Sequence, residues 1–103
     1  MQRDFAPMVY CMASKRNGTL YIGVTSNLMQ RGAQHRAGTL SGFSEKYATK
    51  RLVWFEAHAT MENAINREKQ LKKWNRAWKI RLIESENPRW RDVAMDIGFE
   101  ALR

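Results

Sequence analysis

The sequence predicts an α+β fold with a sandwich-like arrangement, in which helices flank a small three-stranded antiparallel sheet in the order β-β-α-β-α-α. An Asn-Gly pair between two runs of β-favouring residues is typical of a hairpin. Later stretches combine N-cap side chains with apolar residues at helical spacing. A chain of 103 residues has the size of one domain, so we expect a single domain over residues 1–103 with its core at about 7–93.

The first two strands are expected at Met8–Ala13 and at residues 20–24, which are rich in β-favouring side chains. Asn17 and Gly18 lie between them, and both residue types adopt the positive φ of a tight turn. A turn at this place brings Tyr10 and Tyr21 close together across the ladder. Two interpretations are open: the tyrosines pack on the core, or they form a pair of phenols above a substrate groove.

A helix is expected at about Leu28–Ala37, since residues 25–27 offer N-cap side chains and Gly38 is a typical helix stop. Residues 39–50 mix Gly, Ser and charge and indicate a loop. The apolar run at residues 52–55 is short enough for a buried third strand.

Two more helices follow the third strand. Thr60 caps the first of them, which should run to about Trp74. The second spans residues 77–84, with Trp78, Leu82 and Ile83 roughly on one side, and Asn87-Pro88 breaks it. The tail over residues 89–103 carries enough apolar side chains to pack on the domain.

Composition narrows the class of protein. Eighteen Lys and Arg against ten Asp and Glu give a net charge of +8 and a pI near 10.2, which favours a polyanionic partner, either nucleic acid or an anionic membrane surface. No apolar run approaches the ~18 residues of a membrane span, and the N-terminus lacks a signal peptide's apolar stretch. With one cysteine, neither an internal disulfide nor a cysteine-built zinc site is possible. We therefore expect a small cytoplasmic basic domain in which Cys11 and His58 are structural.

Two further groups of side chains are candidates for function, one on the first helix and one in the basic segment at residues 67–81. Arg31 and His35 project from one helix face at i, i+4, either as a solvated surface or as a phosphate clamp with a nearby imidazole. The segment 67–81 is strongly basic and interleaved with Trp74 and Trp78, and it is either a solvated helix face or a surface for a phosphate backbone. The candidate nucleic-acid-binding residues there are Lys69, Lys72, Lys73, Arg76 and Lys79.

Glu68 is the most informative residue. At 100° per residue it falls within the apolar arc that Met61, Ala64, Ile65 and Leu71 define, and Asn75 lies on the same line if the helix reaches it. A carboxylate on the core-facing side is costly unless it is paired or bound to a metal. It is expected either to pair with Arg31 or Arg51 or to hold a divalent cation such as Mg²⁺.

Together these segments resemble the GIY-YIG nuclease family, whose hallmark is two short strand motifs, an arginine on the following helix and a glutamate on a later one. Tyr21-Ile22-Gly23 matches the second motif, and Met8-Val9-Tyr10 stands in place of the first, of which it keeps the tyrosine. Arg31 and Glu68 stand at the family's arginine and glutamate positions. The resemblance covers about residues 7–93, and the chain looks like the small stand-alone bacterial members of the family.

The resemblance implies metal-assisted hydrolysis of a DNA phosphodiester, with one Mg²⁺ or Mn²⁺ ion held by Glu68. Tyr10 would be the general base, Tyr21 would line the site, and Arg31 would stabilise charge on the phosphoryl oxygens. His35 would assist near the phosphate, and Tyr47 is a weaker candidate for site contact. The implied partner is DNA in duplex, branched or single-stranded form, and the implied state is a monomer or weak dimer without a small-molecule cofactor.

Two alternatives stand beside the endonuclease. The first is a catalytically weak nucleic-acid-binding module on the same scaffold, which would be expected to lose some of the set Tyr10, Tyr21, Arg31 and Glu68. The second is a basic adaptor for an acidic protein, which leaves the core-facing Glu68 unexplained.

Overall fold

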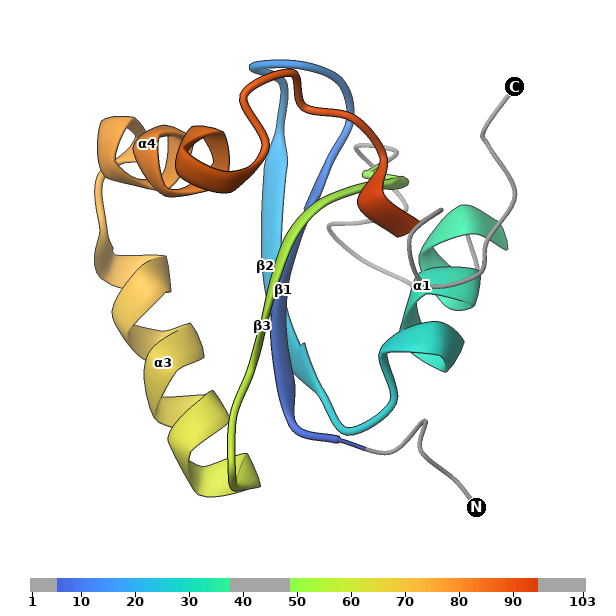
Figure 1. Ribbon diagram of the computed structural model, residues 1–103, viewed down its shortest axis with the longest axis vertical. Coiled ribbons are helices and arrows are strands. Elements are labelled where there is room, and N and C mark those ends of the chain that lie inside the picture. Colours follow the sequence, from blue (N-terminus) through green and yellow to red (C-terminus); the bar gives the residue numbers. More distant parts are fainter. Residues whose placement is uncertain (1–5, 38–48, 95–103) are drawn as a thin grey trace.

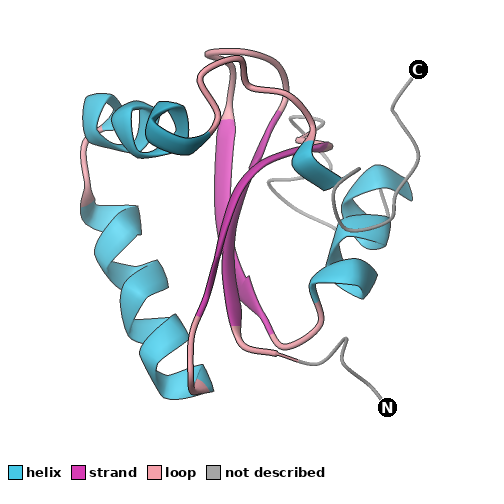
Figure 2. Ribbon diagram, viewed as in Figure 1, coloured by secondary structure: helices cyan, strands magenta, loops and turns pink. Residues whose placement is uncertain are grey.

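The computed structural model describes residues 6–37 and 49–94 and confirms the predicted order of elements and the α+β class. A three-stranded antiparallel sheet lies at the centre, with helix α1 on one side and helices α3 and α4 on the other (Figure 1, Figure 2). The predicted loop at residues 39–50 and the end of the tail lie largely outside the described residues, as does Gly38.

The strands are β1 (Met8–Ala13), β2 (Leu20–Thr25) and β3 (Arg51–Ala57), and the sheet order β2-β1-β3 places β1 in the middle. The hairpin is confirmed, and Asn17 takes the positive φ, at 56°, that its turn requires. The strand β3 is longer than the apolar run predicts, because Glu56 and Ala57 continue its pairing with β1. Backbone pairing therefore extends the strand beyond its buried residues.

The helices are α1 (Leu28–Ala37), α3 (Met61–Lys73) and α4 (Arg76–Glu86). Thr60 caps α3 as predicted, and its Oγ1 accepts a hydrogen bond of 3.1 Å from the Asn63 amide. Asn75 does not extend the line of Glu68: its side chain accepts from the Trp78 amide at 2.9 Å and starts α4. The helix α4 therefore begins slightly before the predicted span of residues 77–84, and it also ends slightly after that span.

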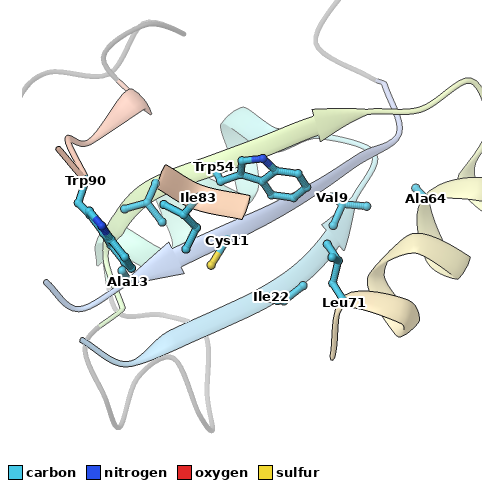
Figure 3. Close-up of a cluster of buried hydrophobic side chains, with 10 residues drawn as sticks. Val9, Cys11, Ala13, Ile22, Trp54, Ala64, Leu71, Ile83 and Trp90 are labelled. Carbon is cyan, nitrogen blue, oxygen red and sulfur yellow. The ribbon is translucent and has the colours of Figure 1, made fainter. Parts of the chain in front are cut away.

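The two faces of the sheet bury separate apolar clusters, since side chains alternate along β1. Residues of odd number on β1 face α3 and α4, where Val9 and Cys11 pack with Leu71, Ile83 and Trp90 (Figure 3). Residues of even number on β1 face the side of α1, where Tyr10 and Met12 pack with Leu28, Leu52 and Ala94. The described part of the tail packs on the domain as expected, with Trp90 and Ala94 buried, and residues 95–103 lie outside the described residues.

The apolar arc of α3 is narrower than the sequence predicts. Ala64 and Leu71 are buried, whereas Met61 and Ile65 lie at the exposed edge of the helix. On α4, Ile83 is buried but the Trp78 side chain is 49% exposed, so these residues do not share one buried face. The difference arises because both helices contact the sheet along a narrow line of residues.

The outer edge of β3 is covered by the segment that follows α4. Asn87 donates to the Val53 carbonyl at 3.0 Å, and the Leu52 amide donates to Asp92 at 3.2 Å. Such cover satisfies backbone groups that an edge strand would otherwise expose. Within the described residues, none of the helices is long and apolar enough to cross a membrane.

Candidate active site

Tyr10 places its phenol over the backbone of the edge strand β2. In the β1–β2 ladder Tyr10 lies directly opposite Gly23, which has no side chain. A Cβ at position 23 would collide with the hydroxyl and ring of Tyr10. Gly23 is therefore the residue that lets the phenol cross β2 toward the edge of the sheet.

Tyr21 joins Tyr10 on the same face of the hairpin. The two ring centroids are 6.3 Å apart, and the ring planes form an angle of 30°. Tyr10 is fully buried and Tyr21 is half-buried, so Tyr21 forms the solvent side of the pair. The expected approach of the two tyrosines across the ladder is confirmed: Tyr10 packs in the core, while Tyr21 reaches the surface.

Arg31 comes from the first turn of α1, whose start Asn27 caps by accepting from the Gln30 amide at 3.1 Å. Its side chain hydrogen-bonds the Tyr10 hydroxyl, with the guanidinium as donor. Burial raises the pKa of the Tyr10 phenol well above its ordinary value, and the neighbouring Tyr21 and the Glu68 carboxylate raise it further. The charge and hydrogen bond of Arg31 act on that pKa in the opposite direction.

Glu68 lies on α3, which packs chiefly against β2 and β1, and its carboxylate acts electrostatically on the same phenol. Its side chain is 14% exposed, so the carboxylate lies at the margin of the core. Of the two alternatives for Glu68, the pairing with Arg31 or Arg51 is wrong. Glu68 Oε2 lies 2.8 Å from Lys72 Nζ one turn along α3, while the Arg51 guanidinium donates to the Trp90 carbonyl.

A divalent cation fits the chemistry of this carboxylate. Mg²⁺ is commonly held by one or two carboxylates together with water and substrate phosphate oxygens, so a single partly accessible glutamate suffices. No cluster of three or more His, Cys, Asp or Glu side chains occurs within residues 6–37 and 49–94. Glu68 would thus be the one side chain among the candidates to hold the ion, and Lys72 would have to leave it.

The predicted DNA-binding residues divide by location. Lys69 and Lys73 are exposed on α3. Lys72 and Lys79 line a groove beside β2 with Leu20, Tyr21 and Ile22. Arg76 donates two hydrogen bonds of 2.7 Å to the Asn17 and Gly18 carbonyls, which fixes the hairpin turn to α4.

Other predicted residues are structural or lie outside the description. The His58 ring pairs with Glu56 at 2.7 Å, and Cys11 is a buried free thiol, as expected of structural residues. His35 lies on α1, but its side chain is not among those described, and Tyr47 lies outside the described residues altogether.

Comparison with known proteins agrees with this arrangement. The model of the GIY-YIG catalytic domain matches residues 6–81, a range that includes both tyrosines, Arg31 and Glu68. The chain belongs to the GIY-YIG nuclease family. It is 33% identical over 76 residues to a UPF0213 protein of Staphylococcus haemolyticus, covering 74% of this chain and 92% of the relative. It is 36% identical over 92 residues to a UPF0213 protein of Syntrophus aciditrophicus, covering 85% and 97%.

A solved structure supports the fold. The solution NMR structure of UPF0213 protein BH0048 from Bacillus halodurans matches with a TM-score of 0.53, covering 91% of this chain and 98% of that one, at 21% identity. This likeness shows that the GIY-YIG chain and the UPF0213 protein share a fold.

Two features of the GIY-YIG site were not foreseen from sequence. The steric role of Gly23 follows from the register that places it opposite Tyr10. The length of the hairpin turn sets this register and is the sequence signal from which the role could have been found. The Glu68–Lys72 ion pair has the i, i+4 spacing of a helix salt bridge, a signal that the sequence already contains.

Proposed function

We propose that this GIY-YIG chain is a divalent-metal-dependent endonuclease that hydrolyses phosphodiester bonds of DNA. The observation that carries the proposal is that Tyr21 lies beside the Tyr10 phenol while Arg31 and Glu68, from two further elements, both act on its pKa. Gathering two phenols, a guanidinium and a carboxylate at one sheet edge costs desolvation, which a charged ligand at that edge would offset. The net charge of +8 supports a polyanionic substrate.

Tyr10 is the proposed general base, which takes a proton from the attacking water at its phenol oxygen. Burial raises the pKa of the phenol, whereas the hydrogen bond and charge of Arg31 favour the phenolate. A base with a high pKa is strong once ionised but scarce at neutral pH. Tyr21, half-buried beside it, would orient the water with its hydroxyl.

Arg31 would stabilise the negative charge that develops on the phosphoryl oxygens, because a guanidinium offers several donors in a fixed plane. His35 follows Arg31 by one helical turn and would assist near the same phosphate. Lys69, Lys72, Lys73, Arg76 and Lys79 would contact the phosphate backbone on either side.

Glu68 would hold one Mg²⁺ or Mn²⁺ ion. When bound there, the ion supplies positive charge for the leaving oxygen. Glu68 would also position the ion relative to Tyr10, whose pKa its carboxylate affects.

The test is nicking of supercoiled plasmid DNA with Mg²⁺ or Mn²⁺ against EDTA, using wild-type protein and Glu68→Gln. Wild-type protein should cleave only with the metal, and Glu68→Gln should bind DNA with near-wild-type affinity and not cleave. The matched control is Glu62→Gln, which makes the same change at an exposed position in the first turn of α3 and should cleave normally. Wild-type cleavage by Glu68→Gln would overturn the metal assignment.

A second candidate is the catalytically weak nucleic-acid-binding module. Two features favour it: burial raises the pKa of the Tyr10 phenol, which makes the phenolate scarcer, and Lys72 already pairs with the Glu68 carboxylate. DNA binding without cleavage of duplex, branched or single-stranded DNA, with either metal, would select this alternative.

A further inference from the structure

A groove of about 250 Å³ lies beside the candidate active site, between the edge strand β2 and the helices α3 and α4. Three consecutive residues of β2, Leu20, Tyr21 and Ile22, form one wall. Lys72 from the end of α3 and Lys79 from the first half of α4 form the other. The groove adjoins the candidate site, because Tyr21 belongs to both and Lys72, which lines the groove, lies 2.8 Å from Glu68.

The charge of the groove is positive. Among the described residues, its lining holds two lysines and no acidic side chain. The positive charge of Lys79, together with that of Arg76, acts on the buried thiol of Cys11 and partly offsets the rise that burial causes in its pKa. A volume of about 250 Å³ holds a phosphate with several waters, each of which occupies about 30 Å³ in the liquid. The groove is therefore suited to a hydrated anion.

Lys72 belongs to both the candidate active site and the groove. Its ammonium lies 2.8 Å from Glu68, and its side chain also lines the groove. The lysine is 54% exposed and the glutamate 14%, so the lysine is the partner that is free to move. The pair is open to solvent on its lysine side, and a phosphate within reach competes well for the ammonium.

We propose that the groove is a phosphate subsite for the nucleic acid strand next to the scissile position, and that Lys72 exchanges Glu68 for this phosphate when the strand binds. The inference rests on the proposed function and deepens it. Occupation of the groove would free the carboxylate of Glu68 at the moment when the substrate is in place. Lys79 would hold the same phosphate from α4 without any contact with Glu68.

The first experiment measures binding of a fluorescein-labelled DNA duplex of about 20 base pairs, in EDTA, over a series of salt concentrations. Lys72→Gln and Lys79→Gln should each flatten the log–log salt slope by about 0.9, the value of one lost phosphate contact on duplex DNA. Lys50→Gln is the matched control, because Lys50 is exposed before β3 and does not line the groove. It removes the same charge and should leave the slope near wild type. Unchanged slopes in both groove variants would overturn the subsite.

The second experiment measures Mn²⁺ binding to the protein without DNA, from the free-ion signal in electron paramagnetic resonance. Lys72→Gln should bind Mn²⁺ about two- to fivefold more tightly than wild type, the range expected when a weak competing ion pair is removed. Lys79→Gln removes an equal charge from the same groove without touching Glu68, and should show a clearly smaller gain. Equal gains in the two variants would show a general charge effect and overturn the exchange of partners.

These readouts separate the inference from the function on which it rests. A wild-type protein that cleaves DNA while both groove variants keep the wild-type salt slope retains the endonuclease and refutes the subsite. A wild-type protein that never cleaves, with flattened slopes in both variants, retains the subsite as a binding groove and refutes the endonuclease.

Discussion

The Tyr10 phenol is under opposing influences that set how it can act as a base. Burial, Tyr21 and Glu68 raise its pKa, while the charge and hydrogen bond of Arg31 lower it. The net effect is a rise, so the phenol is protonated at neutral pH. Its ionised fraction increases about tenfold with each unit of pH as long as the pH stays below that pKa. The residue is therefore a base whose action depends on pH throughout the physiological range.

From this pH dependence of the ionised fraction we predict that the logarithm of the single-turnover cleavage rate constant rises with pH, with a slope of about one between about pH 7 and pH 9. Tyr10→Phe should remove this rise and most of the rate, because it deletes the hydroxyl that is the proposed general base. Its thermal stability and DNA affinity should stay near wild type, since the ring that packs beside Leu28 and Leu52 is retained. A Tyr10→Phe protein that cleaves normally would remove the phenol from the mechanism.

Arg31 provides a second prediction at the scale of one residue. Arg31→Ala should slow the chemical step by ~10²–10³-fold, the effect of losing one preorganised electrostatic donor. Arg31→Lys should restore only part of the rate, because an ammonium does not reproduce the guanidinium fork. The tyrosine ring-carbon NMR shifts of Tyr10 at neutral pH should also change in Arg31→Ala, since the hydrogen bond from the guanidinium is gone. Unchanged Tyr10 shifts would contradict the contact.

At the scale of elements, the β1–β2 hairpin aligns the site through its register. Because Tyr10 stands opposite Gly23, a methyl group at position 23 enters the space of the phenol. Gly23→Ala should destabilise the fold by ~1–3 kcal/mol, the usual effect of overpacking, and should reduce cleavage by moving the Tyr10 hydroxyl. Urea unfolding and single-turnover cleavage measure the two effects.

The phenol oxygen is the atom nearest to that added methyl group, so the control is the same change in a Tyr10→Phe background. There Gly23→Ala should cost less stability than it does in the wild type, because part of the collision is removed. Equal losses in both backgrounds would mean that the methyl group acts through the backbone and not through the phenol.

How much of the fold was predictable differs between elements. The hairpin, α1 and α3 were predicted almost to the residue, because Asn17 and Thr60 are local signals whose partners lie within a few positions. The end of β3 and the width of the buried face on α3 were missed, because they depend on pairing with β1 and on contact with the sheet. The seam between β3 and residues 87–94 rests on Asn87 and Asp92, whose partners lie far away in the sequence and leave no local signal.

In the candidate site too, features with a local sequence signal were predicted and features that depend on long-range contacts were not. Its members Tyr10, Tyr21, Arg31 and Glu68 were found from sequence, since each stands at a recognisable position within one element. The approach of Tyr10 and Tyr21 was predicted as well, but the placement of Arg31 and Glu68 around them was not, because it depends on α1 and α3 lying on opposite sides of the sheet (Figure 1). For this reason the partner of Glu68 was predicted wrongly, although Lys72 lies only one helical turn away.

At the scale of the whole molecule, the layered fold leaves β2 as the strand edge at which the site and groove meet. Residues 87–94 cover the outer edge of β3, whereas Tyr21 and Ile22 of β2 line the basic groove. The site and the groove thus share one edge of the sheet, and a nucleic acid strand following β2 would pass both. One chain offers one such edge among its described residues, and therefore one set of the four site groups.

A single site makes a prediction about the products of cleavage. Hydrolysis at one site cuts one strand, so supercoiled plasmid should first become open circle, and linear DNA should appear only later from a second, independent cut. The initial rate of nicking should be first order in protein, as expected of a monomer. Gel analysis of the three plasmid forms over time, at several protein concentrations, measures both quantities. A rate that rises with the square of protein concentration, together with linear DNA appearing at the same time as open circle, would indicate instead that two chains act together on the two strands.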